Sequence, residues 1–255
     1  MAYSPLPDID PVRSDLAERG YETVRLSGAS EPAAVATGGQ APEAVTDRPL
    51  SVEPLGEATP LRLVATLAAA ARDQRATLFV ADPETAREAN ETLSEPFLRR
   101  PDEDGSRAFY SIPDRILLTD DTYAAVGTDG TLRWREEPAT AGVTGDGTDD
   151  PRLRLEADGD LAAALPSVDG LTCPGPDPSA FPYRYSRGAD KRIHVFDRDG
   201  ELGTVRGITA MKSDGYRPVP LPLVPEHHLR ENAHLARRWT VAAVDENGEV
   251  SYRTA

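Results

Sequence analysis

Apolar side chains between Leu61 and Ala71 recur every three or four residues, which places them on one face of a helix. Thr59 precedes this stretch as a helix-capping residue, and Pro60 follows at the position where proline is well tolerated in a first turn. The pattern therefore predicts a helix over residues 60–72, with its apolar stripe turned toward a core.

The same reading extends to the neighbouring segments of the first hundred residues. The continuous apolar run 76–81 is typical of a buried strand, and the cap and proline at Asp82 and Pro83 predict a helix that ends near Leu93. Earlier in the chain the pattern predicts a short helix, a strand and, within a loop-rich stretch, one further strand: residues 11–20, 22–26, and 50–55 within 27–59.

Short strand-like segments dominate the middle of the chain. Four follow one another closely, at residues 107–112, 115–119, 123–127 and 131–136. Because the turn Asp129-Gly130 separates the last two, we expect them to pair as a hairpin. Residues 137–150 have no periodicity and predict a loop, after which a strand over 152–156 and a short helix over 161–165 are expected.

Beyond a proline-rich stretch at 174–178 the pattern becomes mostly β. Asp199-Gly200 and Asn247-Gly248 each separate two strand-like runs, and such dipeptides favour hairpin turns. The repeated prolines of 218–225 allow only an edge strand or an extended segment. Residues 226–237 have the spacing of a helix.

Together these elements predict an α+β fold, in which a mixed α/β N-terminal layer is joined to a β-rich C-terminal module. The stretches rich in glycine and proline divide the chain into three parts. These are an N-terminal segment over 1–58 that is partly loop, an α/β domain over 59–172 and a β-rich module with one helix over 179–255.

One segment resembles a known family. Residues 193–205, Ile-His-Val-Phe-Asp-Arg-Asp-Gly-Glu-Leu-Gly-Thr-Val, look like the opening hairpin of PRC-barrel domains. The resemblance implies a small β-barrel that serves as an adaptor and binds proteins or RNA. It implies no catalytic residues.

The composition indicates the environment of the protein. Acidic residues number 43 against 28 basic ones, the net charge is −15, and lysine occurs only at Lys191 and Lys212. This profile resembles haloarchaeal cytosolic proteins, whose acidic surfaces keep them dissolved in concentrated salt. No apolar stretch is long enough to cross a membrane and no secretory signal is visible, so we expect a cytoplasmic protein. The single cysteine, Cys173, excludes an internal disulfide and predicts an inert thiol.

Charge is distributed unevenly along the chain. Residues 181–255 contain 12 basic and 10 acidic residues, whereas the first 180 residues have a net charge of −17. We therefore expect a contact surface in the C-terminal region. The alternative is that this region is better folded and less exposed, so that fewer acidic surface residues are needed to keep it dissolved.

Aromatic and basic residues interleave in one part of that region. The residues are Tyr183, Arg184, Tyr185, Arg187, Lys191 and Arg192. Rings can stack on bases while arginines contact phosphates, so the cluster is a candidate partner-binding site for nucleic acid. The alternative is a strand whose rings pack in the core while its arginines reach the solvent.

The predicted helix 226–237 carries a second candidate. His227, Glu231 and His234 fall on one face of it, which suggests a metal site or acid–base chemistry. The alternative is an ordinary solvated helix face. The sequence contains no glycine-rich phosphate loop and no nucleophile elbow, and we expect no cofactor.

These observations favour a non-enzymatic binding or regulatory protein, an adaptor that contacts a protein or a nucleic acid through its near-neutral C-terminal region. Both kinds of partner remain open. The alternative is a metal- or histidine-dependent enzyme that uses the 226–234 face. A membrane partner is not expected.

Overall fold

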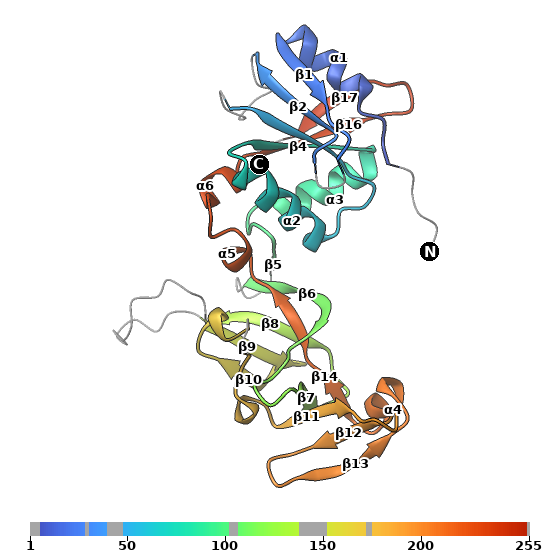
Figure 1. The fold of residues 1–255 in the computed structure, drawn as a ribbon, viewed down its shortest axis with the longest axis vertical. Helices are drawn as coiled ribbons and strands as arrows, with labels where there is room; N and C mark the ends of the chain where they lie inside the picture. Colours follow the sequence, from blue (N-terminus) through green and yellow to red (C-terminus); the bar gives the residue numbers. More distant parts are fainter. Residues whose placement is uncertain are drawn as a thin grey trace, which may run out of the picture. The chain divides into compact units, whose positions relative to one another are not determined.

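The computed structural model describes residues 6–28, 31–39, 48–101, 107–137, 152–171 and 175–253. Its backbone contacts divide the chain into two compact units (Figure 1). Unit 1 combines Met1–Leu98 with Pro225–Ala255, and unit 2 is Arg99–Val224. Unit 2 is therefore an insertion in the sequence of unit 1.

Unit 1 is built on a six-stranded mixed sheet with the order β1-β2-β3-β4-β16-β17. The strands are β1 (Tyr21–Arg25), β2 (Ala34–Gly38), β3 (Leu50–Pro54), β4 (Ala76–Ala81), β16 (Trp239–Val244) and β17 (Val250–Arg253). Strand β4 runs parallel to both of its neighbours, β3 and β16. The other pairs are antiparallel.

Helices cover both faces of this sheet (Figure 1). They are α1 (Asp10–Glu18), α2 (Pro60–Arg72) and α3 (Pro83–Leu93), with the short α5 (Pro225–His228) and α6 (Ala233–Ala236). Leu78 and Val80 of β4 share a core with Leu16 of α1, whereas Phe79 points to the opposite face, where α2 and α3 contact β4. All six residues of β4 are buried, which explains its continuous apolar sequence.

Unit 2 consists of two antiparallel sheets. The first has the order β10 (Asp160–Leu165), β9 (Arg152–Ala157), β8 (Leu132–Glu137), β6 (Arg107–Arg115) and β15 (Pro220–Leu223), and β5 (Arg99–Pro101) also pairs with β6. The second has the order β13 (Glu201–Val205), β12 (Ile193–Phe196), β11 (Tyr183–Arg187), β7 (Tyr123–Gly127) and β14 (Tyr216–Pro218). Two 3-10 turns, Val168–Leu171 and Pro178–Ala180, precede β11.

Two apolar cores hold unit 2 together. Phe109, Trp134 and Leu155 of the first sheet pack with Ala124 and Val126 of the second. A second core lies on the other side of the second sheet, where Ile208 and Met211 of α4 (Ile208–Ser213) cover residues of β7, β11 and β12. Side chains therefore alternate between two buried faces along β7.

The predicted α+β class is confirmed, because a mixed sheet with helices is joined to antiparallel sheets. The division of the chain differs from the three predicted segments. The β-rich part lies in the middle of the chain, and the last strands complete the N-terminal sheet, since β16 pairs with β4. The stretches rich in glycine and proline show where loops occur, but they do not show which distant strands pair.

Several local predictions are confirmed, among them the helices at 60–72 and 83–93, both C-terminal hairpins and the edge strands within 218–225. Others are wrong. Residues 161–165 belong to a strand, β10, because they pair with β9. The segment 131–136 forms β8, which pairs with β6 and β9 instead of β7.

Two further segments, 115–119 and 27–59, also differ from the prediction. Of residues 115–119, only Arg115 belongs to a strand, while Leu117 forms an isolated bridge with Tyr123. The loop-rich stretch 27–59 contains β2, which was not predicted. Cys173 and the predicted loop after Glu137, up to residue 150, lie outside the described residues. Within the described part of the chain, no helix is both long and apolar enough to span a membrane.

Candidate functional site

Of the two tyrosines in the predicted partner-binding cluster, Tyr185 is buried in unit 2 and Tyr183 is half-buried. They alternate with Arg184 along β11, so both face the core beneath α4. Tyr185 is 5% exposed, and the ring of Tyr183 packs edge-on against Tyr216 with 5.0 Å between ring centroids. Tyr185 is therefore a core residue, and Tyr183 packs against the same core, which is the arrangement that the alternative interpretation expected.

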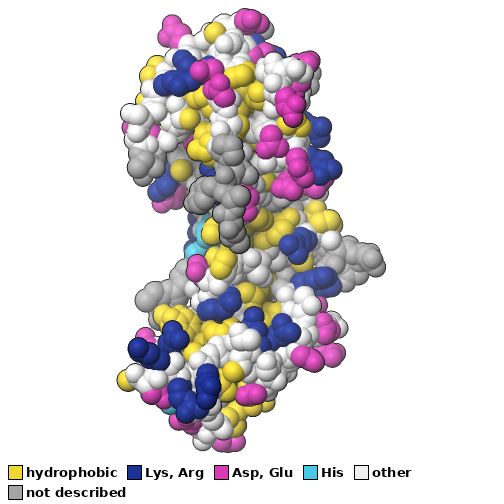
Figure 2. Space-filling model, turned by 90° about the vertical axis from the view of Figure 1, so that its right-hand side faces the viewer, with side chains coloured by type: hydrophobic (Ala, Val, Ile, Leu, Met, Phe, Trp, Pro, Cys, Tyr) yellow, Lys and Arg dark blue, Asp and Glu magenta, His cyan; other side chains and the backbone are white. Residues whose placement is uncertain are grey.

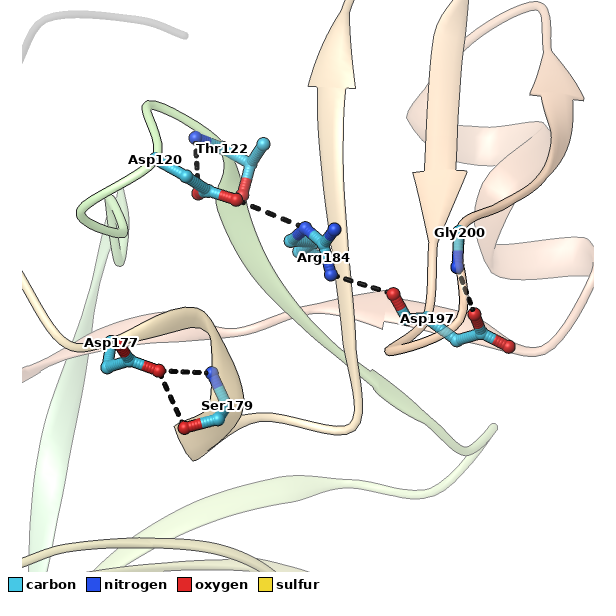
Figure 3. Close-up of polar contacts among 7 residues, drawn as sticks. All are labelled: Asp120, Thr122, Asp177, Ser179, Arg184, Asp197 and Gly200. Atoms are coloured by element: carbon cyan, nitrogen blue, oxygen red, sulfur yellow. Dashed lines mark hydrogen bonds and ion pairs between the residues drawn. The ribbon is translucent and has the colours of Figure 1, made fainter.

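Arg184 is held by contacts within the protein (Figure 3). Its Nε lies 3.1 Å from Oδ2 of Asp120, and its Nη1 donates a hydrogen bond of 2.7 Å to the carbonyl of Asp197. The guanidinium also lies 5.4 Å from the ring centroid of Phe196. Arg184 thus ties the turn before β7 to the turn between β12 and β13, and it has a structural role.

The turns around Arg184 are closed by short side-chain hydrogen bonds (Figure 3). The Asp197 carboxylate accepts from the backbone N–H of Gly200 at 3.0 Å, and Asp177 accepts from the N–H and the hydroxyl of Ser179 at 2.8 and 2.6 Å. Hydrogen bonds from Ser179 hold the pKa of Asp177 below its ordinary value. These two carboxylates therefore stabilise their own turns through hydrogen bonds.

The other basic residues of the predicted cluster remain at the surface. Arg187, Lys191 and Arg192 are exposed. Arg187 donates a hydrogen bond of 3.4 Å to the backbone carbonyl of Lys191. Among the residues that the structure describes, none of the three forms an ion pair. The cluster thus divides into a packed part and an exposed basic part.

A second basic group, which the sequence did not predict, lines one pocket of unit 2. We call it the basic pocket and define it by Arg115, Lys212 and Arg217. Thr131, Leu132, Pro218 and Pro220 complete the lining, and no described carboxylate side chain belongs to it. On the face drawn in Figure 2, Lys and Arg side chains gather in the middle of unit 2, with Asp and Glu mostly toward its edges.

The fold brings these three cations together from separate elements. Arg115 ends β6, where it lies opposite Pro220 of β15. Arg217 lies on β14, opposite Val126, and Lys212 follows the buried Met211 on α4. Because β14 and β15 are consecutive but belong to different sheets, this corner collects residues from both sheets.

Backbone carbonyls, and not carboxylates, hold the two guanidinium groups. Nη1 of Arg115 donates to the carbonyl of Pro113 at 2.6 Å, and Nη2 of Arg217 donates to the carbonyl of Asp129. Within the described part of the chain, neither arginine nor Lys212 is ion-paired. The charges are therefore oriented without being neutralised.

Arg115 also affects a buried neighbour. Burial raises the pKa of the Tyr185 hydroxyl, while the nearby Arg115 guanidinium acts in the opposite direction. The basic pocket thus adjoins the core that contains the predicted tyrosines. Sequence reasoning could have found Lys212 and Arg217 from the basic bias of 181–255, but Arg115 lies in the acidic part of the chain and has no local signal.

The candidate metal site is not assembled. The predicted helix over 226–237 is wrong: α5 ends at His228, α6 begins at Ala233, and Asn232 between them has a left-handed backbone with φ of 56°. His227 and Glu231 line one pocket, but His234 does not belong to it. Among the described residues, no three His, Cys, Asp or Glu side chains are grouped as metal ligands.

Comparison with protein-family models, curated proteins and solved structures gave no match. The resemblance to PRC-barrel domains is thus still confined to the hairpin 193–205, which the structure contains as β12 and β13.

Proposed function

We propose that this chain is a non-catalytic binding protein, a regulatory or adaptor protein, whose unit 2 binds nucleic-acid phosphates through the basic pocket. One observation carries the proposal. Three cationic side chains surround a single pocket without a described carboxylate in its lining, in a chain with 43 acidic and 28 basic residues. Unpaired cations that lie close together repel one another, which raises the free energy of the folded state unless an anion binds between them.

The way these cations are held favours phosphate as the ligand. Arginine presents a planar set of donors that matches phosphate oxygens, and lysine acts on phosphate as a point charge. In Arg115 and Arg217, a carbonyl engages one end of each guanidinium and fixes its direction. Preoriented donors lose less conformational entropy when the ligand binds.

The arrangement also indicates how the nucleic acid would be contacted. Because Tyr183 and Tyr185 are packed against other side chains, base stacking on them does not contribute. The expected contacts are with the sugar–phosphate backbone, which position a nucleic acid without reading its sequence. The exposed Arg187, Lys191 and Arg192 of the same unit add positive charge that such a partner would meet.

The experiment measures the fluorescence anisotropy of labelled RNA and DNA, single-stranded and duplex, with the full chain in graded concentrations of potassium chloride. We expect binding that weakens as salt increases. The double variant Arg115→Glu/Arg217→Glu should weaken binding by about tenfold or more, and the slope of log affinity against log salt should fall by about two.

Arg87→Glu is the matched control, because it reverses an exposed charge on α3 of unit 1, away from the basic residues of unit 2. A change smaller than about threefold in this variant, beside a large loss in the double variant, supports the pocket. If each reversed charge weakens binding by the same factor in the control and in the double variant, the attraction is diffuse and the proposed site in the pocket is contradicted. Failure to bind any nucleic acid while circular dichroism shows a folded chain would also overturn the proposal, and a stoichiometric protein partner from nuclease-treated extract would replace it.

A further inference from the structure

Unit 1 has a pocket of its own, distinct from the basic pocket of unit 2. It lies where the last turn of α2 meets the segment that joins α5 to α6. Its lining is Ala68, Arg72, His227, His228, Arg230 and Glu231. Nothing in the proposed nucleic-acid binding uses these residues.

Asn232 positions the segment after α5 against the end of α2. Its left-handed backbone turns the chain after α5, and its Nδ2 donates a hydrogen bond of 3.2 Å to the carbonyl of Ala71 at the end of α2. Asparagine adopts this conformation at low cost. The contact brings the two histidines and Glu231 beside Arg72, so residues more than 150 positions apart line one pocket.

The end of α2 does not repel an anion at this point. Helix C-termini carry partial negative charge on unbonded carbonyls. Here the carbonyl of Ala71 is bonded by Asn232, and the carbonyls of Ala69 and Ala70 accept backbone N–H groups at 3.3 and 2.9 Å. Arg72 therefore presents its charge to the pocket beside satisfied carbonyls.

Two of the lining groups have unused hydrogen-bonding capacity. Nδ1 of His227 is buried and has no hydrogen-bond partner among the residues that the structure describes, and the ring packs edge-on against His228 with 5.4 Å between centroids. Arg72 is exposed and, within the described residues, forms no ion pair. A buried polar atom without a partner destabilises the folded state, and a ligand that engages the ring would offset this.

We infer that this pocket binds inorganic hydrogen phosphate. Arg72 would bind two phosphate oxygens, and the imidazoles would donate to a third. Glu231 decides the chemical class, because a carboxylate repels a fully deprotonated anion but accepts a hydrogen bond from the P–O–H of hydrogen phosphate. Sulfate has no such proton near neutral pH, so the pocket should prefer phosphate over sulfate.

The test is isothermal titration of the full chain with potassium phosphate and, separately, with potassium sulfate, at constant potassium chloride and neutral pH. We expect phosphate to bind about tenfold or more tightly than sulfate. Arg72→Gln should weaken phosphate binding by about tenfold. Glu231→Gln should improve sulfate binding and bring the two affinities close together. Arg87→Gln, an exposed arginine of α3 outside the pocket, is the matched control and should change neither affinity.

Several results would overturn the inference. These are a folded protein that binds neither anion, an equal loss in Arg72→Gln and Arg87→Gln, or sulfate bound as well as phosphate by the wild type. Phosphate binding that disappears in Arg115→Glu but persists in Arg72→Gln would place the anion in unit 2 and would also contradict it. The inference does not depend on the proposed function, since Arg72→Gln and Glu231→Gln change only unit 1.

Discussion

The indole Nε1 of Trp134 donates a hydrogen bond to the carbonyl of Pro220, 2.8 Å away and 86 residues later in the chain. Trp134 lies fully buried between the two sheets of unit 2, and Pro220 lines the basic pocket. The bond therefore fastens one wall of the pocket to the core. It links the position of the cations to the packing of the whole unit.

Replacing Trp134 by Phe should lower the free energy of unfolding by about 2–3 kcal/mol, because the smaller ring leaves space and the Pro220 carbonyl loses its donor. Guanidinium denaturation followed by circular dichroism measures this. Trp239→Phe is the control, since Trp239 is also buried but its indole has no hydrogen bond within the described residues. If both variants lose the same stability, the hydrogen bond contributes little.

Glu53 of β3 should make unit 1 less stable at alkaline pH. Burial raises the pKa of Glu53 to about 7 from an ordinary value of 4.5, although Arg62 and Arg75 act to lower it. The folded chain thus holds this proton more firmly than the unfolded chain. The resulting stability is fully present below about pH 4.5 and is lost as the pH rises through about 7.

Glu53→Gln removes this dependence. At pH 8 the variant should be more stable than the wild type by up to about 3 kcal/mol, and the difference should shrink as the pH falls toward 5. Denaturation curves at several pH values measure it. A constant difference at all pH values would show that ionisation of Glu53 is not the cause.

Asp82 and Thr59 occupy equivalent positions before α3 and α2, but only one of them caps its helix. The Asp82 carboxylate accepts from the N–H groups of Glu84 and Thr85 at 2.9 and 3.0 Å, whereas Thr59 makes no side-chain capping hydrogen bond. Asp82→Ala should therefore cost about 1–2 kcal/mol, and Thr59→Ala much less.

The pH dependence of the Asp82 effect follows from its surroundings. Burial acts to raise the pKa of Asp82, but the hydrogen bonds from Thr85 and Glu84 outweigh it, so the pKa lies below the ordinary 3.8. The stabilisation is present above that value and is lost as the pH falls through the lowered pKa. Thermal unfolding near neutral pH and in acid measures both variants. Equal losses for Asp82→Ala and Thr59→Ala would contradict the capping role.

His194 on β12 should titrate above the ordinary histidine range. Its Nδ1 lies 2.9 Å from Glu201 and its Nε2 lies 3.4 Å from Asp190, and these hydrogen bonds raise the pKa of His194, that to Glu201 most. Proton NMR of the imidazole should give a midpoint above about 6.5, and Glu201→Gln should lower it. The stability that these contacts add is present in acid and is lost as the pH rises through the raised pKa.

A glycine makes this histidine arrangement possible. A Cβ on Gly188 would lie 2.5 Å from Nε2 of His194 and 2.7 Å from Oδ1 of Asp190. Gly188→Ala should therefore displace the ring and return its titration toward the ordinary value. An unchanged midpoint in Gly188→Ala would mean that the loop yields without loss of the contact.

Much of the secondary structure could be predicted because its cause is local. The apolar spacing within 60–72 and the Asn247-Gly248 turn depend only on near neighbours in sequence. The strand β10 could not be predicted in this way. Its alanines favour a helix by propensity, but pairing with β9 outweighs that small preference.

The candidate sites depended on contacts that no local pattern records. The alternation along β11 was readable, but whether Tyr183 and Tyr185 faced the core or the solvent depended on α4. Likewise Asn232 breaks the expected helix because its side chain reaches Ala71, far away in the sequence. The general bias toward basic residues in 181–255 was informative, while the residue that completes the basic pocket, Arg115, came from another part of the chain.

The insertion of unit 2 within unit 1 has a consequence for synthesis on the ribosome. Strand β4 is made early, but its parallel neighbour β16 is translated only after all of unit 2. Both ends of the insertion pair with adjacent residues of β6, since Arg99 lies opposite Phe109 and Leu223 opposite Tyr110. Unit 2 can thus close on itself while the nascent sheet of unit 1 still has an open edge at β4. Strands β16 and β17, which are translated after unit 2, complete the sheet at that edge.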